Sequence, residues 1–308
     1  MDTVLILVRQ ILQMFLLAAL GFVLFRTGRI SQEGSKALAN ILIYLVIPVV
    51  IINGFMVERD EAHLIGMAVS AAASAVLLLV STVIARLFFR RDAIAAFSAA
   101  FSNPGFFGIP LILASLGSGA VFYVNSFLAL LNIGQWTYGV SIMTGQPVRQ
   151  SFRPKQLIRA PFVCAIAIGL VLFLTQLQLP EIVQGCMNSV AALNTPLAMF
   201  TVGIYLAQTN VRNMLRRRSL PLLCAVRLLI IPAVSALLLS LLPASMNTLK
   251  FALLLVAACP AGSNVAVYAQ LHGKDYPYAV ETVITTTLCS LASIPLVVYL
   301  AELLGFVG

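Results

Sequence analysis

Residues 102–110 read Ser-Asn-Pro-Gly-Phe-Phe-Gly-Ile-Pro and interrupt an apolar run that extends from Ala93 to Leu116. Pro104 lacks a backbone donor and disfavours helical geometry at Asn103, and Gly105 frees the chain further. Asn103 lies roughly 12 residues inside the charged end of the run. At about 1.5 Å per residue it lies roughly 18 Å deep, near the midplane of a ~30 Å hydrocarbon layer. We therefore expect a helix that opens at mid-membrane depth, where the freed peptide groups must face protein or a cavity.

The composition is that of a membrane protein. Of the 308 residues, 61% are hydrophobic and only 9% are charged, and the mean hydropathy is +1.02. This predicts an all-α polytopic membrane protein. The net charge of +9 resides largely in short connections, which is typical of orientation signals and does not indicate nucleic-acid binding. The five cysteines are scattered singly, so no metal site is expected.

Ten apolar runs approach the ~20 residues that a membrane-spanning helix needs. They are Val4–Phe25, Ala37–Met56, Leu64–Phe88, Ala93–Leu116, Ala120–Met143, Pro161–Leu179, Ile182–Ala207, Leu220–Leu242, Leu249–Leu271 and Pro277–Leu304. The first run lacks the basic start and the cleavage site of a signal peptide, so we expect it to be the first membrane helix.

Basic residues alternate along the connections between these runs. The first, third, fifth and seventh connections are basic, and the even ones between them are neutral or acidic. The basic residues are Arg26, Arg29, Lys36, Arg86, Arg90, Arg91, Arg149, Arg153, Lys155, Arg159, Arg212, Arg216, Arg217 and Arg218. The positive-inside rule places these connections in the cytoplasm, so we expect a multi-pass protein of the cytoplasmic (inner) membrane with both termini outside.

The basic connection 144–160 divides the chain into two sets of five runs, residues 1–143 and 161–308. An odd number of helices gives the two sets opposite orientations. We therefore expect a 5+5 inverted repeat.

Two helix breaks occur at corresponding positions of the repeats. Pro260 lies about ten residues inside Lys250, hence near 15 Å deep, which matches the depth of Asn103. Similarly, Pro48 in the second run corresponds to Pro196 in the seventh. Broken helices of opposite direction at the midplane are typical of secondary transporters.

Each break should leave a half-helix whose unpaired N–H groups and positive dipole end favour an anion. Neutral polar side chains would complete the site without burying a countercharge. The candidate substrate-binding residues are Asn103, Pro104, Gly105, Pro260, Gly262, Ser263 and Asn264. The alternative is a pair of proline kinks whose free groups are satisfied by neighbouring helices.

Further polar residues lie beside the prolines of the second and seventh runs. They are Asn40, Tyr44, Asn53, Thr201 and Tyr205. Asn40 and Tyr44 share a helix face, as do Thr201 and Tyr205. They could line a path to the site, or they could form ordinary interhelical hydrogen bonds.

Two charged residues enter the apolar runs. Arg227 would lie roughly 12 Å deep, where it could guide anions inward or extend toward lipid phosphate. Glu281 is a candidate carrier of a proton or cation, and its alternative is an interfacial residue near Lys274.

Several enzyme classes lack their motifs. The sequence contains no H-E-x-x-H, no G-x-S-x-G and no G-x-x-x-x-G-K-[ST]. We therefore expect no enzyme activity and no cofactor, and transport driven by a gradient, with H⁺ or Na⁺ as the candidate coupling ion.

Five motifs, taken in order, resemble the auxin efflux carrier family in its prokaryotic branch of organic-acid permeases. They are Tyr44–Pro48, Asn103–Leu111, Thr195–Gly203, Pro260–Asn264 and Thr287–Leu296. The resemblance spans essentially the whole chain. It implies a fold similar to bile-acid symporters and sodium/proton antiporters, whose fourth and ninth helices cross at the substrate, and a homodimer formed through scaffold helices.

The chain departs from plant members of that family in two ways. Pro104 follows the asparagine, whereas a proline precedes it there, and the long central loop is absent. We therefore expect a small mono- or dicarboxylate rather than auxin, moved by alternating access. A membrane-embedded ligand sensor or an anion channel remains the alternative.

Overall fold

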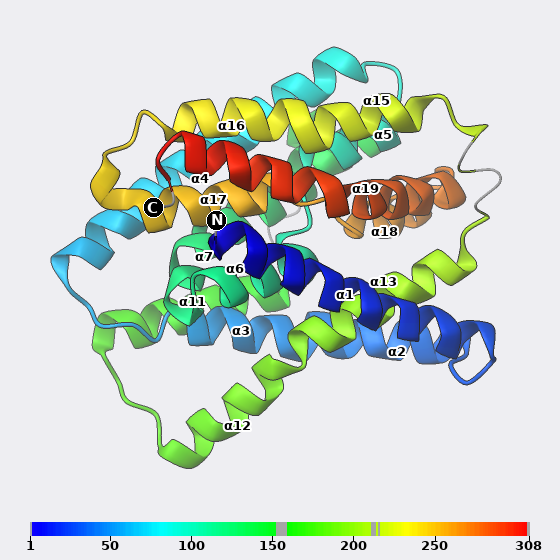
Figure 1. Ribbon diagram of the computed structural model, residues 1–308. Helices are drawn as coiled ribbons and strands as arrows, with labels where there is room; N and C mark the ends of the chain where they lie inside the picture. The colour runs from blue at the N-terminus through cyan, green and yellow to red at the C-terminus, as the bar shows by residue number, and fades with distance from the viewer. Residues whose placement is uncertain (1, 152–158, 211–213, 215, 307–308) are drawn as a thin grey trace.

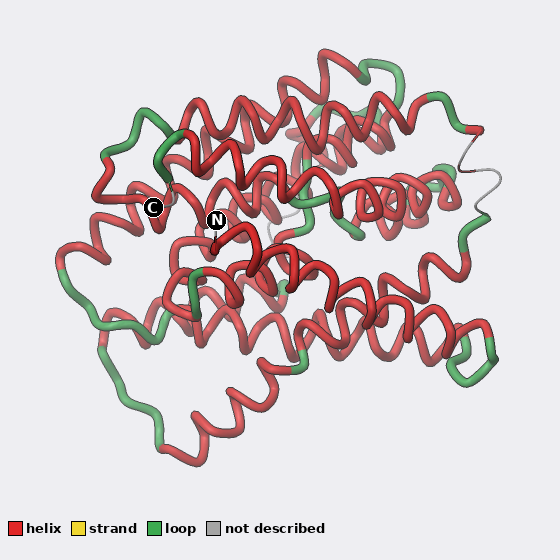
Figure 2. The backbone as a smooth tube through the Cα atoms, viewed as in Figure 1, coloured by secondary structure: helices red, strands yellow, loops and turns green. Residues whose placement is uncertain are grey.

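The computed structural model describes residues 2–151, 159–210, 214 and 216–306. Every regular element in these ranges is helical, and no strand forms among them (Figure 2). Within this part of the chain, six helical segments are long and apolar enough to cross a membrane: Val4–Arg26, Gln32–Gly54, Glu61–Phe88, Glu181–Gln208, Ser219–Leu239 and Tyr276–Leu303. Shorter apolar helices are Pro104–Ser115, Pro161–Thr175 and Ala244–Ala258. The chain is an all-helical, multi-pass membrane protein.

The helices follow one another in two sets, of which the second begins after the basic connection. The first set comprises α1 (Asp2–Arg26), α2 (Gln32–Ile41), η1 (Leu42–Val46), α3 (Ile47–Gly54), α4 (Glu61–Phe88), α5 (Ala93–Ala100), η2 (Pro104–Gly108), α6 (Ile109–Ser115), η3 (Ser118–Ala120), α7 (Val121–Gly134), η4 (Gln135–Gly139), α8 (Val140–Thr144) and α9 (Val148–Ser151).

The second set comprises α11 (Pro161–Thr175), α12 (Glu181–Ala192), α13 (Asn194–Gln208), α15 (Ser219–Ala225), η5 (Val226–Ile230), α16 (Ile231–Leu239), η6 (Ala244–Met246), α17 (Asn247–Ala258), α18 (Asn264–Leu271) and α19 (Tyr276–Leu303). Arg153, Lys155 and Arg212 of the basic connections lie outside the described residues.

Several helices begin at a side-chain cap. Asp60 accepts a hydrogen bond from His63 N at 2.6 Å, and Asp92 accepts one from Ala95 N at 2.9 Å. Asp275 caps α19 in the same way. Each carboxylate satisfies one of the free N–H groups of the first turn and favours the positive end of the helix dipole.

Prolines also account for the π-helical turns η1, η2 and η5. Pro48, Pro110 and Pro232 each occupy the second position of the α-helix that follows such a turn. A proline ring clashes with the carbonyl four residues before it and offers no donor. Widening the preceding turn relieves this clash, so the helix continues through the proline instead of ending there.

The helices form two groups that face each other (Figure 1). The first helix group, α1, α2–α3 and α11–α13, occupies the lower part of the view. The second helix group contains α4–α8 and α15–α19. The groups meet where α1 packs against α6 and α19, where α13 contacts η2, and where α3 contacts α7.

Inside the first helix group, α1 and α13 cross with their backbones in close contact. A Cβ atom at Gly203 would lie 2.7 Å from the carbonyl carbon of Ala18 and 2.8 Å from the amide nitrogen of Phe22. Gly21 approaches the backbone of Phe200 in the same way. Small residues permit this approach, which is the usual way in which membrane helices gain packing contacts.

In the second helix group, two helices are interrupted and their extended stretches pair with each other. Asn103 N donates to Pro260 O at 2.9 Å, and Gly262 N donates to Phe101 O at 3.0 Å. Ser102 and Ala261 thereby form an antiparallel bridge. Figure 2 shows these short loop stretches in the interior of the molecule. Each break therefore satisfies peptide groups that the other leaves free.

Arg227 joins the carbonyl ends of the two helices that lead into these breaks. Its Nη1 donates to Ala99 O at 3.0 Å and its Nε donates to Cys259 O at 3.1 Å, while Nη2 donates to Ala257 O. The side chain is buried, so it does not extend toward the lipid surface. One guanidinium thus supplies donors to α5 and α17 at once.

Replacing Gly203 by alanine should lower the apparent melting temperature of the purified protein. A Cβ there must push α1 away from α13, and overpacking of this kind costs about 1–3 kcal/mol. Gly185→Ala in α12 is the matched control because nothing lies within 4 Å of its Cβ position. It should unfold at the wild-type temperature or slightly above. Equal melting of Gly203→Ala and the wild type would show that the crossing is looser than described.

Replacing Arg227 by methionine should destabilise the protein by at least about 3 kcal/mol, because three buried carbonyls lose charged donors. Arg227→Lys should recover part of this loss, since one ammonium cannot reach all three acceptors. Arg218→Met, at an exposed position, is the control. Thermal unfolding in detergent measures all three, and an unaltered Arg227→Met protein would contradict the role of the guanidinium.

Candidate substrate site

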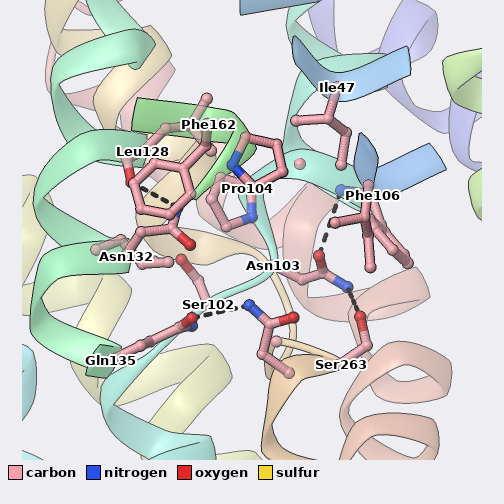
Figure 3. Close-up of a pocket in the computed structure, with 16 residues that line it drawn as sticks. Ile47, Ser102, Asn103, Pro104, Phe106, Leu128, Asn132, Gln135, Phe162 and Ser263 are labelled. Carbon is pink, nitrogen blue, oxygen red and sulfur yellow. Dashed lines mark hydrogen bonds between the residues drawn. The ribbon is translucent and has the colours of Figure 1, made fainter. Parts of the chain in front are cut away.

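A cavity of about 100 Å³ lies beside the paired breaks, between the two helix groups. The breaks contribute Ser102, Asn103 and Ser263, and the first helix group contributes apolar side chains that include Ile47 and Phe162 (Figure 3). A space of this size accommodates several water-sized groups or one small molecule. The sequence-predicted residues Pro104, Gly105, Gly262 and Asn264 also line it.

Asn103 is buried and holds the start of the second half-helix. Its Oδ1 accepts a hydrogen bond from Phe106 N at 3.3 Å, and its Nδ2 donates to Ser263 Oγ at 3.5 Å. The side chain therefore caps one half-helix and reaches the start of the other, as Figure 3 shows.

Gly262 has no room for a side chain. A Cβ at this position would lie 2.8 Å from Ser102 O. Pro260 does not line the cavity, but its carbonyl accepts the hydrogen bond from Asn103 N. These two residues shape the second break so that it can pair with the first.

Ser102 carries the most informative polar atom of the cavity. Its Oγ is buried and has no hydrogen-bond partner among the described residues. An unsatisfied buried hydroxyl is costly, and native proteins retain one mainly where a ligand or water completes it. Ser102 therefore places a hydroxyl without a described protein partner at the wall of the cavity.

The opposite wall of the cavity holds Asn132 and Gln135, which sequence reasoning missed. Gln135 Oε1 accepts a hydrogen bond from Asn264 Nδ2 at 2.8 Å, and Asn132 Nδ2 donates to Leu128 O at 2.8 Å. Both amides face the breaks in Figure 3. Their three-residue spacing inside an apolar run, which puts them on one helix face, was the signal that could have identified them.

The electrostatic field in the cavity favours negative charge. Helix ends carry about half an elementary charge each, positive at the N-terminus and negative at the C-terminus. The carbonyl ends of α5 and α17 are balanced by the single positive charge of Arg227. The N-terminal ends of Pro104–Ser115 and α18 remain uncompensated, because none of the described residues that line the cavity is acidic or basic.

The polar residues predicted on the second and seventh runs do not line this cavity. Tyr44 is 66% exposed, because Ile43 and Ile47 of the same segment face the cavity instead. Asn40 is also exposed. Asn53 Nδ2 donates to Asn188 Oδ1 at 3.2 Å, which is an interhelical hydrogen bond.

Thr201 and Tyr205 also lie away from the cavity. Thr201 is buried and its hydroxyl donates to Leu197 O at 2.8 Å, one turn earlier in the same helix. Tyr205 packs against the apolar core. Neither residue is among those that line the cavity at the breaks.

Glu281 lies in a separate cavity of about 530 Å³ at the start of α19. The carboxylate is buried and accepts a hydrogen bond from Arg217 Nε at 3.0 Å, while Arg217 Nη2 donates to Asp275 at 2.9 Å. Burial acts to lower the pKa of Arg217, but the hydrogen bond to Asp275 and the charges of both carboxylates raise it overall. Glu281 is therefore ion-paired, with Arg217 and not Lys274 as its partner.

Comparison with known proteins agrees with the arrangement of motifs. Residues 6–298 match the model of a family described as membrane transport protein. A protein of Rhizobium meliloti (strain 1021) named "Putative malonate transporter" is 23% identical over 305 residues, which cover 94% of each chain. The chain therefore belongs to the membrane transport protein family, that of the auxin efflux carriers, as its motifs indicate.

Proposed function

We propose that the chain is a secondary transporter that moves a small organic anion, a mono- or dicarboxylate, by alternating access. The carboxylate would bind in the cavity at the paired breaks, between the N-terminal ends of Pro104–Ser115 and α18. Asn103 and Ser102 would supply polar contacts, and Gln135 would hold Asn264 in position.

The observation that carries this proposal is the buried Ser102 Oγ with no partner, in a cavity whose helix ends are positive. A carboxylate accepts hydrogen bonds only, so it would satisfy this O–H. A neutral site of this kind avoids the cost of burying a countercharge in the absence of substrate. The name of the Rhizobium meliloti relative makes malonate the first anion to test.

The proposal includes a membrane topology. Ten spanning segments in a 5+5 inverted repeat would place both termini outside the cytoplasmic membrane. The basic α1–α2 connection lies at the right end of the molecule in Figure 1, opposite the start of α1, which is consistent with the positive-inside rule.

The two helix groups would act as the moving parts. The first helix group would form the scaffold and the second the transport domain, so residues 1–143 and 161–308 would each contribute to both. A proton or Na⁺ gradient would drive the cycle, and Glu281 is the candidate coupling carboxylate. Dimerisation would use scaffold helices.

Ser102→Ala should weaken transport without destabilising the protein. Removing a hydroxyl that has no partner is neutral or stabilising for folding, whereas a lost hydrogen bond to a charged ligand weakens binding by about 1.5–3 kcal/mol, roughly tenfold or more. Uptake of labelled malonate into proteoliposomes gives the KM, and thermal unfolding gives the stability. Ser115→Ala, whose hydroxyl bonds only within its own helix, is the control. A wild-type KM in Ser102→Ala would remove this hydroxyl from the site.

Asn103→Asp tests the sign of the charge of the substrate. Aspartate has the same shape and can still accept from Phe106 N, so the cap should persist. A carboxylate beside a bound anion at low dielectric should reduce malonate exchange by about 100-fold or more. Asn188→Asp, in the exposed helix α12, is the matched control.

The exchange assay also separates the alternatives. In a carrier, unlabelled malonate inside the vesicles accelerates the entry of labelled malonate. If the wild-type protein shows no such acceleration, a channel or a sensor would be favoured. Malonate exchange in Asn103→Asp at the wild-type rate or faster would show that no anion binds beside residue 103 and would contradict the proposal.

A further inference from the structure

A third cavity, of about 560 Å³, lies at the end of α4, remote from the breaks in sequence and built from different residues. Three arginines line it: Arg86 in the last turn of α4, and Arg90 and Arg91 in the turn that leads into α5. Opposite them lie Tyr138 and Ser141 of the η4–α8 segment. The cavity therefore combines three cations with neutral hydrogen-bonding groups.

The three positive charges have no acidic counterpart within the part of the chain that the structure describes. None of the three arginines forms an ion pair within the described part of the chain, and no acidic side chain is among the described residues that line the cavity. Asp92 is adjacent in sequence, but its Oδ1 accepts from Ala95 N and its Oδ2 accepts from Tyr278 OH at 2.7 Å. Its hydrogen bonds are thus made outside the cavity, and the exposed guanidinium groups of the three arginines are open to an anionic occupant.

Both walls of the cavity are held in place. On one side the ring of Phe89 is buried and fixes the turn, so that Arg90 and Arg91 remain on the exposed side. On the other side α8 ends at Gly145, whose left-handed conformation (φ 73°) turns the chain, and Ser141 Oγ donates to Gln146 O at 2.5 Å. A preorganised wall lowers the ordering cost of binding an anion.

Arginine forks match the oxygens of a phosphate group, and basic pockets of this type at membrane interfaces bind lipid headgroups. The outer face of α4 also exposes an apolar stripe at helical spacing, formed by Val76, Leu79, Val83 and Leu87. This stripe is roughly 16 Å long and ends beside Arg86, so an acyl chain could lie along it while its headgroup occupies the cavity.

We infer that the cavity lined by Arg86, Arg90 and Arg91 binds the phosphate group of an anionic ligand, and that the α4 stripe makes an anionic phospholipid the source. This site is independent of the substrate cavity. Its occupancy would hold the α4–α5 turn, from which the first broken helix begins.

The test uses the full-length protein in detergent and two probes. Native mass spectrometry measures binding of phosphatidylglycerol against phosphatidylcholine, and thermal unfolding measures stabilisation by inorganic phosphate. The test variant is the triple substitution Arg86→Gln, Arg90→Gln and Arg91→Gln. The matched control is Arg26→Gln, Arg29→Gln and Lys36→Gln, which removes the same charge from another basic connection.

Phosphatidylglycerol should bind the wild type and the control with similar affinity, and the Arg86/Arg90/Arg91 variant about 100-fold more weakly. Stabilisation by inorganic phosphate with no preference for phosphatidylglycerol would support the phosphate site but assign it to a soluble ligand. Equal losses in both triple variants would reduce the effect to bulk charge and overturn the inference, as would no binding of either probe to the wild type. If the triple variant does not fold, Arg90→Gln alone is compared with Arg29→Gln.

Discussion

The structure depends on how it satisfies peptide groups where two helices stop inside an apolar molecule. A buried N–H or C=O without a partner costs a few kcal/mol, and membrane lipid offers none. The chain solves this by pairing the two breaks: Asn103 N meets Pro260 O, and Gly262 N meets Phe101 O. Each break therefore supplies hydrogen-bond partners that the other needs, in an antiparallel arrangement.

The peptide groups that remain at the breaks have different surroundings according to their partial charge, negative for the carbonyl groups and positive for the N–H groups. The carbonyl ends face Arg227, which uses three nitrogens on three acceptors, and the N–H ends face the cavity. This division gives a neutral-lined cavity a positive potential without placing a charged side chain in it. An anion bound there, as we propose, would meet the helix ends and could leave without breaking a salt bridge.

Sequence patterns predicted the helical class and both interruptions, because Pro104–Gly105 and Pro260 act on the backbone locally. They also identified Asn103, Ser263 and Asn264, which are close to the breaks in the chain. Residues that reach the cavity from other helices could not be predicted in this way. Gln135 depends on how α7 and η4 pack, and Tyr44 was expected near the site because helix spacing does not reveal which face points inward.

Arg227 illustrates the same limit. Its depth could be counted from the sequence, but depth alone does not distinguish an anion guide, a lipid contact and a structural cation. The decisive fact is tertiary: η5 lies where the ends of α5 and α17 converge. A guanidinium placed there finds three acceptors in the interior, which is a better environment than extension toward the headgroups.

The contacts between the two helix groups differ in kind from those within them. Inside the first helix group, α1 and α13 touch backbone to backbone at Gly203. Across the boundary, two side-chain amides form hydrogen bonds: Asn194 Nδ2 donates to Gly105 O at 3.4 Å, and Asn125 Nδ2 donates to Ile51 O at 3.2 Å. The amide oxygen of each asparagine has no partner among the described residues. The rest of the cavity's wall from the first helix group is apolar. Apolar contacts do not depend strongly on direction, so a movement of one helix group relative to the other would break few hydrogen bonds. The two breaks, which are hydrogen-bonded to each other, would move together.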